Sequence, residues 1–211
     1  MISFIKSQIY LNESWIKPTT LLNLRWLAIT GQAFAIAVTE LLFELTFNGQ
    51  ACLTIIIFSC IVNLGSSIYF RAQKRLTAFK TFLFLSFDLI QISVLLFFAG
   101  GTSNPFSMLI IVPAIVSASS LPVIYLITLG IMTLLSIMLL SVQYFPIIDS
   151  SGDVLKPPQI LLVGFSASLM ITVTFLGGYV RRIFLDNSNM NKALQAAQVA
   201  LERERKLTAL T

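Results

Sequence analysis

The chain has 211 residues, of which 56% are hydrophobic and only 11% are charged, and its mean hydropathy is +0.88. A soluble core of this size cannot bury so much apolar surface, so the composition excludes an ordinary soluble domain and predicts a protein of the lipid bilayer. The formal net charge of +5 is accounted for by basic residues that gather on one side of the membrane, so it calls for no nucleic-acid partner.

Six apolar runs are each long enough, or nearly so, to cross the hydrocarbon layer as a helix. They lie at residues 21–43, 51–70, 81–99, 105–121, 122–143 and 159–180. The pattern predicts an all-α integral membrane protein whose six transmembrane helices occupy 21–180, preceded by a cytoplasmic or interfacial segment at 1–20. Only Ser119-Ser120-Leu121-Pro122 separates the fourth run from the fifth, so a buried reentrant hairpin at 105–143 is the alternative to two full spans.

Basic residues predict the orientation of these helices, because short loops rich in Lys and Arg stay in the cytoplasm. The loops at 44–50 and 100–104 contain neither residue type. The N and C termini are therefore expected in the cytoplasm and the loop at 100–104 outside. The basic residues on the expected inner side are Lys6, Lys17, Arg25, Arg71, Lys74, Arg75, Lys80, Arg181 and Arg182.

Asp88 is an ionisable residue inside the third run, about 12 Å beyond Lys80 by helical rise. A charge at that depth is costly, so Asp88 is a candidate for a signalling or pocket residue, and Gln91 shares its helix face. The alternative is a structural clasp between helices, in which Asp88 is protonated or pairs with Asn63 or Gln32.

The stretch Gly100-Gly101-Thr102-Ser103-Asn104-Pro105-Phe106 joins the third and fourth runs and has the composition of a ligand-binding turn. Two glycines permit a tight turn and close approach to the backbone, Asn104 can cap the next helix, and Pro105 suits its first turn. Further candidates at this depth are Glu40, near the outer end of the first run, and Phe97 and Phe98 just before the turn. The alternative is that the stretch only caps a helical hairpin, and that Glu40 is simply interfacial.

After Arg181-Arg182 the composition changes to helix-forming polar residues, so the sixth helix is expected to continue into the cytoplasm over 181–211. Heptad-like spacing predicts dimerisation in one of two competing registers. One register is Met190, Ala193, Ala197, Ala200 and Leu207, and the other is Leu194, Ala197, Leu201 and Thr208. The chain has no histidine and no nucleotide-binding glycine motif, so no catalytic or metal site is predicted in it.

The heptapeptide, the segment Leu24-Arg25-Trp26-Leu27-Ala28, the six-run layout and the segment 201–207 together resemble the membrane sensor domain of RegB/PrrB-type redox-responsive histidine kinases. The resemblance implies that a quinone, either ubiquinone or menaquinone, binds at Gly100, Gly101, Asn104, Pro105 and Phe106. It also implies residence in a bacterial inner membrane, and control of a kinase core that uses ATP and Mg²⁺, follows Thr211 and phosphorylates a response regulator.

Two other classes remain as alternatives. A small transporter or channel would use a polar path around Asp88 and Gln91, beside a fourth helix kinked at Pro113. An integral membrane enzyme acting on lipid or quinone is the third class, and the lack of histidine and of a carboxylate cluster in the loops weighs against it.

Overall fold

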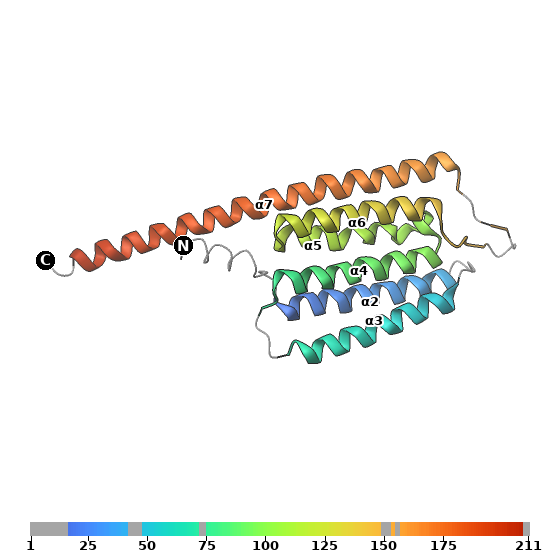
Figure 1. Cartoon of the computed structure of the whole chain (residues 1–211), viewed down its shortest axis with the longest axis horizontal. Helices are drawn as coiled ribbons and strands as arrows, with labels where there is room; N and C mark the ends of the chain where they lie inside the picture. The colour runs from blue at the N-terminus through green and yellow to red at the C-terminus, as the bar shows by residue number, and fades with distance from the viewer. Residues whose placement is uncertain (1–16, 42–47, 72–74, 149–152, 155–156, 209–211) are drawn as a thin grey trace.

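The computed structural model describes residues 17–41, 48–71, 75–148, 153–154 and 157–208, and this part of the chain forms a helical bundle from which one long helix extends (Figure 1). Most of the predicted segment 1–20 lies outside the described residues. The helices are α2 (Pro18–Leu41), α3 (Gly49–Tyr69), α4 (Ala78–Phe98), η1 (Gly101–Ser103), η2 (Pro105–Ile111), α5 (Val112–Ser120), α6 (Val123–Val142) and α7 (Gln159–Thr208).

Five of these helices, α2, α3, α4, α6 and α7, are long and apolar enough to cross a membrane. Two of them begin at a side-chain cap, as at α3, where the side chain of Asn48 accepts from the backbone N–H of Ala51. Thr77 caps α4 in the same way. The predicted all-α membrane fold is therefore confirmed, with element ends displaced by a few residues.

The fourth apolar run differs from the prediction of one regular helix, because it begins as the 3₁₀ helix η2 and becomes α-helical only at Val112. Pro113 stands in the first turn of α5, where its missing N–H is tolerated, so it starts the α-helix and does not kink its middle. The larger rise of a 3₁₀ helix lets η2 and α5 together cover about 28 Å, close to the thickness of a hydrocarbon core. The segment therefore runs along the bundle instead of turning back within it.

Two clusters of buried apolar side chains hold the bundle together, and α4 contributes to both. The larger cluster joins α4, η2, α5, α6 and α7 with Leu21 of α2, and it includes Leu89, Leu129 and Ile137. The smaller cluster joins α2, α3 and α4 and includes Ile29 and Cys52, which is fully buried. α4 is thus the central helix, with one neighbouring group on each side.

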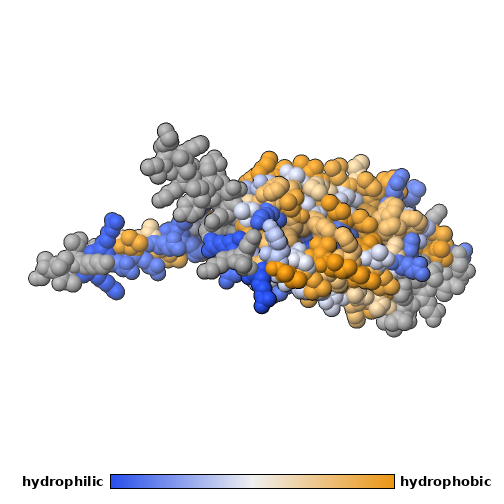
Figure 2. All heavy atoms as spheres, turned by 60° about the horizontal axis from the view of Figure 1, so that its bottom comes forward, coloured by the Kyte–Doolittle hydropathy of each residue, from blue (hydrophilic) through white to orange (hydrophobic). Residues whose placement is uncertain are grey.

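The outer surface of the bundle is apolar, whereas the part of α7 beyond it is largely hydrophilic (Figure 2). Ile68 and Ile160 are 77% and 81% exposed, which suits contact with lipid and not with water. α7 continues as one helix to Thr208, about 40 Å past Arg181 by helical rise. The sixth run is thus part of one helix that continues to Thr208, and the assignment of 181–211 to a cytoplasmic signalling helix stays a prediction.

Candidate functional site

The turn between α4 and η2 depends on two glycines with left-handed backbone. The φ angle is +96° at Gly100 and +62° at Gly101, a region that residues with a Cβ rarely adopt. Gly100 follows the end of α4, and Gly101 begins η1. The tight glycine turn expected from the sequence is therefore present.

Asn104 ties the end of α4 to the beginning of η2. Its Oδ1 accepts a hydrogen bond of 2.8 Å from the backbone N–H of Phe106, and its Nδ2 donates one of 2.8 Å to the carbonyl oxygen of Ala99. Pro105 occupies the first turn of η2, as expected. The turn itself thus uses both ends of the amide, and Asn104 fixes the shape of the turn.

Other residues of the same chain pack closely against the two glycines. A Cβ at Gly100 would lie 2.5 Å from Cδ1 of Ile147, and one at Gly101 would lie 2.6 Å from the carbonyl oxygen of Leu140. Tyr144 also lies within 2.7 Å of that second position. The glycines thus let the end of α6 and the segment after it pack directly onto the turn.

An aromatic cluster forms beside the turn, but its members differ from those expected. The rings of Phe97 and Phe98 pack on Phe145, with centroids 5.4 and 5.3 Å away, and Phe97 accepts a backbone hydrogen bond from Phe145. Phe106 is 39% exposed, and within the described residues it makes no ring contact with this cluster. Phe145 was not identified from the sequence, because 47 positions separate it from Phe98.

A cleft of about 450 Å³ opens between the turn and the first turns of α7. Of the expected ligand residues, Asn104 and Pro105 line it, whereas Gly100, Gly101 and Phe106 do not. The other residues that line the cleft were not candidates from the sequence. They are Thr102, Ser103, Pro157, Ile160, Leu161, Leu162, Gly164 and Phe165. Ser166 of α7 donates a 3.4 Å hydrogen bond to the hydroxyl of Thr102 at this junction.

Ser103 brings to the cleft a hydroxyl that has no hydrogen-bond partner in the described part of the chain. Its hydroxyl oxygen is buried and forms no hydrogen bond with any of the described residues. Thr102 and Ser103 occupy the two variable positions of the heptapeptide, so the motif alone did not single them out. A hydroxyl without an internal partner beside a cleft is a good candidate for contact with a ligand oxygen.

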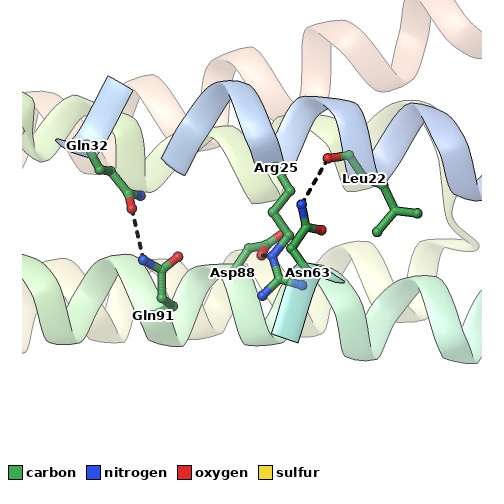
Figure 3. A network of polar contacts seen from close by, with 6 residues as sticks. All are labelled: Leu22, Arg25, Gln32, Asn63, Asp88 and Gln91. Carbon is green, nitrogen blue, oxygen red and sulfur yellow. Dashed lines mark hydrogen bonds and ion pairs between the residues drawn. The ribbon is translucent and has the colours of Figure 1, made fainter. Parts of the chain in front are cut away.

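Asp88 faces Arg25 of α2 across the interface between α2 and α4 (Figure 3). Its Oδ1 lies 2.7 Å from Nε of Arg25, an ion pair whose N–H is not aligned for a hydrogen bond. The guanidinium also lies over the rings of Phe87 and Phe84, 4.4 and 5.1 Å from their centroids. An arginine that is 4% exposed is thereby neutralised inside the bundle.

The expected partners of Asp88, Asn63 and Gln32, are therefore wrong. Gln91 donates a 2.9 Å hydrogen bond to Gln32, and Asn63 donates a 3.4 Å bond to the carbonyl oxygen of Leu22 (Figure 3). Arg25 counts among the basic residues of the expected inner side, and its place about two turns into α2 also lets it reach the carboxylate of Asp88.

Glu40 lies in the last turn of α2, but its side chain is outside the part of the chain that the structure describes. Its expected place near the pocket therefore stays a prediction.

Arg181 forms a further polar contact in the bundle. From the sequence it served only to predict the orientation of the helices. Its Nη1 donates hydrogen bonds of 2.7 Å to the carbonyl oxygen of Leu121 and of 3.4 Å to that of Ala118. These carbonyls belong to the C-terminal end of α5, where helical carbonyls lack internal partners. α7 is thus attached to the segment that follows the turn.

Comparison with known proteins identifies one group of relatives. No family model matches the chain, and no solved structure matches it. The sensor histidine kinase RegB of Cereibacter sphaeroides is 36% identical to the chain over 196 residues, which cover 93% of the chain and 42% of that protein. A second RegB sequence of the same species matches with the same identity and coverage. The chain thus spans about two fifths of these relatives, and along nearly its whole length this membrane protein is homologous to the sensor histidine kinase RegB.

Proposed function

We propose that the chain is the membrane sensor part of a redox-responsive histidine kinase, and that a quinone bound at the cleft beside the turn sets the state of α7. The observation that carries this proposal is the continuity of α7. The helix that lines the cleft at Ile160 and Phe165 is the same unbroken helix that leaves the bundle and ends at Thr208. A ligand in the cleft therefore touches the element that would carry a signal.

The shape and lining of the cleft support a quinone, either ubiquinone or menaquinone, as the ligand. The buried hydroxyl of Ser103 would turn toward the cleft to donate to a carbonyl oxygen of the head group, while the start of α7 offers apolar side chains for the ring and tail. Gly100, Gly101, Asn104 and Pro105 give the turn its shape. Phe106 does not line the cleft, so the contacts to the ligand ring are assigned to the apolar side chains at the start of α7.

The ligand acts only if it binds one arrangement of α7 better than the other, because equal affinity for two states shifts neither. The exposed part of α7 is assigned to a homodimer with a second copy of the chain. Through a kinase core that uses ATP and Mg²⁺, the pair would control autophosphorylation and the transfer of phosphate to a cytoplasmic response regulator. We place the protein in the bacterial inner membrane with both termini in the cytoplasm.

Ligand binding is tested with the purified chain in phospholipid nanodiscs and a short-chain ubiquinone analogue. Ser103→Ala removes a hydroxyl without breaking an internal hydrogen bond, and Phe165→Ala removes part of the apolar lining. Each is expected to weaken binding about tenfold, equivalent to about 1.4 kcal/mol. Phe175→Ala is the matched control, because Phe175 lies on the same helix and is 71% exposed. Parental affinity in both test variants would place the quinone elsewhere.

Control of the kinase is tested with a chimera in which this chain replaces the matched region of the Cereibacter sphaeroides RegB. The quinone analogue is expected to change the rate of autophosphorylation in the parent chimera. The Ser103→Ala and Phe165→Ala chimeras should respond only at higher analogue concentration. A parent chimera that binds the analogue but phosphorylates at an unchanged rate would contradict the proposed control while leaving the binding site intact.

A further inference from the structure

A second cavity, of about 290 Å³, lies between α2, α4 and the η2–α5 segment, and it shares no lining residue with the cleft at the turn. Its walls are mostly apolar, as at Leu85, Ile92 and Val112. Gln32 and Gln91 bring polar groups to it from α2 and α4. The volume is near the lower end of the range for small-molecule sites, which suits one ring or a short chain.

The two glutamines leave hydrogen-bonding capacity unused in this cavity. Both side chains are more than nine-tenths buried, and the single bond between them runs from Gln91 Nε2 to Gln32 Oε1. Among the described residues, Gln32 Nε2 and Gln91 Oε1 form no hydrogen bond, and neither atom is fully buried, so a donor and an acceptor remain for a molecule in the cavity that both residues line. Exchanging O and N in both amides reverses the bond but again leaves one donor and one acceptor, so the conclusion does not depend on the amide assignment.

The charged residues that line the cavity further restrict which ligands it can bind. Arg25 and Asp88 also line the cavity, and their ion pair already balances the two charges. A charged ligand would disturb this balance at a depth where an unpaired charge is expensive. The cavity therefore favours a neutral molecule that enters from the lipid.

We propose that this cavity binds a neutral, lipid-soluble molecule with a hydroxyl group, an alcohol or a phenol, as a site separate from the cleft at the turn. A hydroxyl oxygen accepts from the free donor of the glutamine pair while its proton is donated to the free acceptor. A carbonyl satisfies only the donor, and a hydrocarbon chain satisfies neither. The unused buried pair thus selects for a hydroxyl over its methyl ether or an acyl chain.

Gly31 provides a way to close the cavity without disturbing the fold. It lines the cavity, and a Cβ built on it meets no atom within 4 Å. Gly31→Leu therefore places a side chain in open space and also raises helix propensity. Gly130→Leu is the matched control, because Gly130 of α6 also has no atom within 4 Å of an added Cβ and does not line this cavity.

The test measures binding of 4-nonylphenol, its methyl ether 4-nonylanisole, and 1-dodecanol to the chain in nanodiscs by calorimetry. We expect the phenol or the alcohol to bind saturably and the ether at least about tenfold more weakly. The tighter of the two hydroxyl compounds assigns a ring-bearing or a chain-type ligand. Gly31→Leu should abolish binding and Gly130→Leu should preserve it.

The double variant Gln32→Leu/Gln91→Leu replaces both partners by apolar groups of similar size, which is close to neutral for folding. It should bind the phenol and the ether equally. If the parent protein binds the phenol and the ether with equal affinity, the proposal is overturned. The cavity would then be a groove for acyl chains. Loss of phenol binding in Ser103→Ala, with retention in Gly31→Leu, would show that the cleft at the turn is the only site.

Discussion

Arg181 and Leu121, sixty positions apart in the chain, are joined by a 2.7 Å hydrogen bond from the guanidinium Nη1 to the carbonyl oxygen. At the opposite end of the same segment, Ser166 donates to Thr102. α7 therefore contacts the η1–η2–α5 segment at both ends of that segment. The two contact residues on α7, Ser166 and Arg181, are about 22 Å apart along the helix by helical rise. A change at the turn cannot move this segment along α7 without breaking one of the two contacts.

Arg181→Met is expected to destabilise the bundle by about 1–3 kcal/mol, because the C-terminal carbonyls of α5 lose a charged donor in a partly buried position. Unfolding in mixed detergent micelles, followed by circular dichroism, measures the loss. Arg182→Met is the control, since the neighbouring Arg182 is exposed. Equal stability of the two variants would mean that the contact contributes nothing to holding α7.

Removing either partner of the buried ion pair should be more damaging than removing both. Asp88→Leu and Arg25→Met each leave a charged group without its partner, and each is expected to cost about 3–5 kcal/mol. The double variant Arg25→Met/Asp88→Leu should recover most of that loss. A double-mutant cycle from the same unfolding measurement gives the coupling, and additive losses would contradict a direct pair.

Alanine at Gly101 should destabilise the turn more than alanine at Gly100. Both positions have positive φ, but the added Cβ meets a main-chain oxygen at Gly101 and the flexible end of Ile147 at Gly100. Shortening that side chain in Gly100→Ala/Ile147→Ala should relieve the clash, and its difference from the reference Ile147→Ala, which carries the cost of truncating a buried side chain, is the backbone strain of about 1–2 kcal/mol. Gly130→Ala, in an open helical position, should stabilise the protein by up to about 1 kcal/mol. Thermal unfolding ranks the stabilities of these variants. A larger loss of stability in Gly100→Ala than in Gly101→Ala would contradict this interpretation.

Disulfide crosslinking between two copies should follow a helical period along the exposed end of α7. Single cysteines from Met190 to Leu210, placed in a Cys52→Ala/Cys60→Ala background, are oxidised in membranes and separated on a non-reducing gel. If Leu194 and Leu201, both more than half exposed, face the partner, crosslinking peaks at their register and falls on the opposite face. Peaks at Met190 and Ala193 would select the other register, and uniform or absent crosslinking would argue for a monomer.

The basic residues predict that residue 102 faces outside and Thr211 lies in the cytoplasm. Alkaline phosphatase fused after residue 102 should be active, because that enzyme functions only outside the cytoplasm, and a fusion at Thr211 should be inactive. A green fluorescent protein fusion at Thr211 provides the reciprocal control. The reverse pattern would move the cleft to the cytoplasmic side.

The sequence by itself determined the membrane fold, the positions of the helices and the glycine turn. These features depend on local properties: apolar run length fixes where helices cross, and only glycine adopts a φ of +96° without strain. The caps at Asn104 and Pro105 are equally local, because each acts on its immediate neighbours. The 3₁₀ form of η2 was not predicted, since apolar periodicity does not distinguish it from an α-helix over seven residues.

The tertiary structure alone decided which distant side chains meet. A carboxylate inside the membrane requires a partner, and the sequence indicated Asn63 or Gln32, whereas the packing of α2 against α4 brings Arg25 to it. The wall of the cleft formed by α7 was likewise hidden, because Thr102 and Ser166 lie sixty-four positions apart. Contacts of this kind depend on the rotation and depth of each helix in the bundle, which a few ångströms of displacement change and which hydropathy does not record.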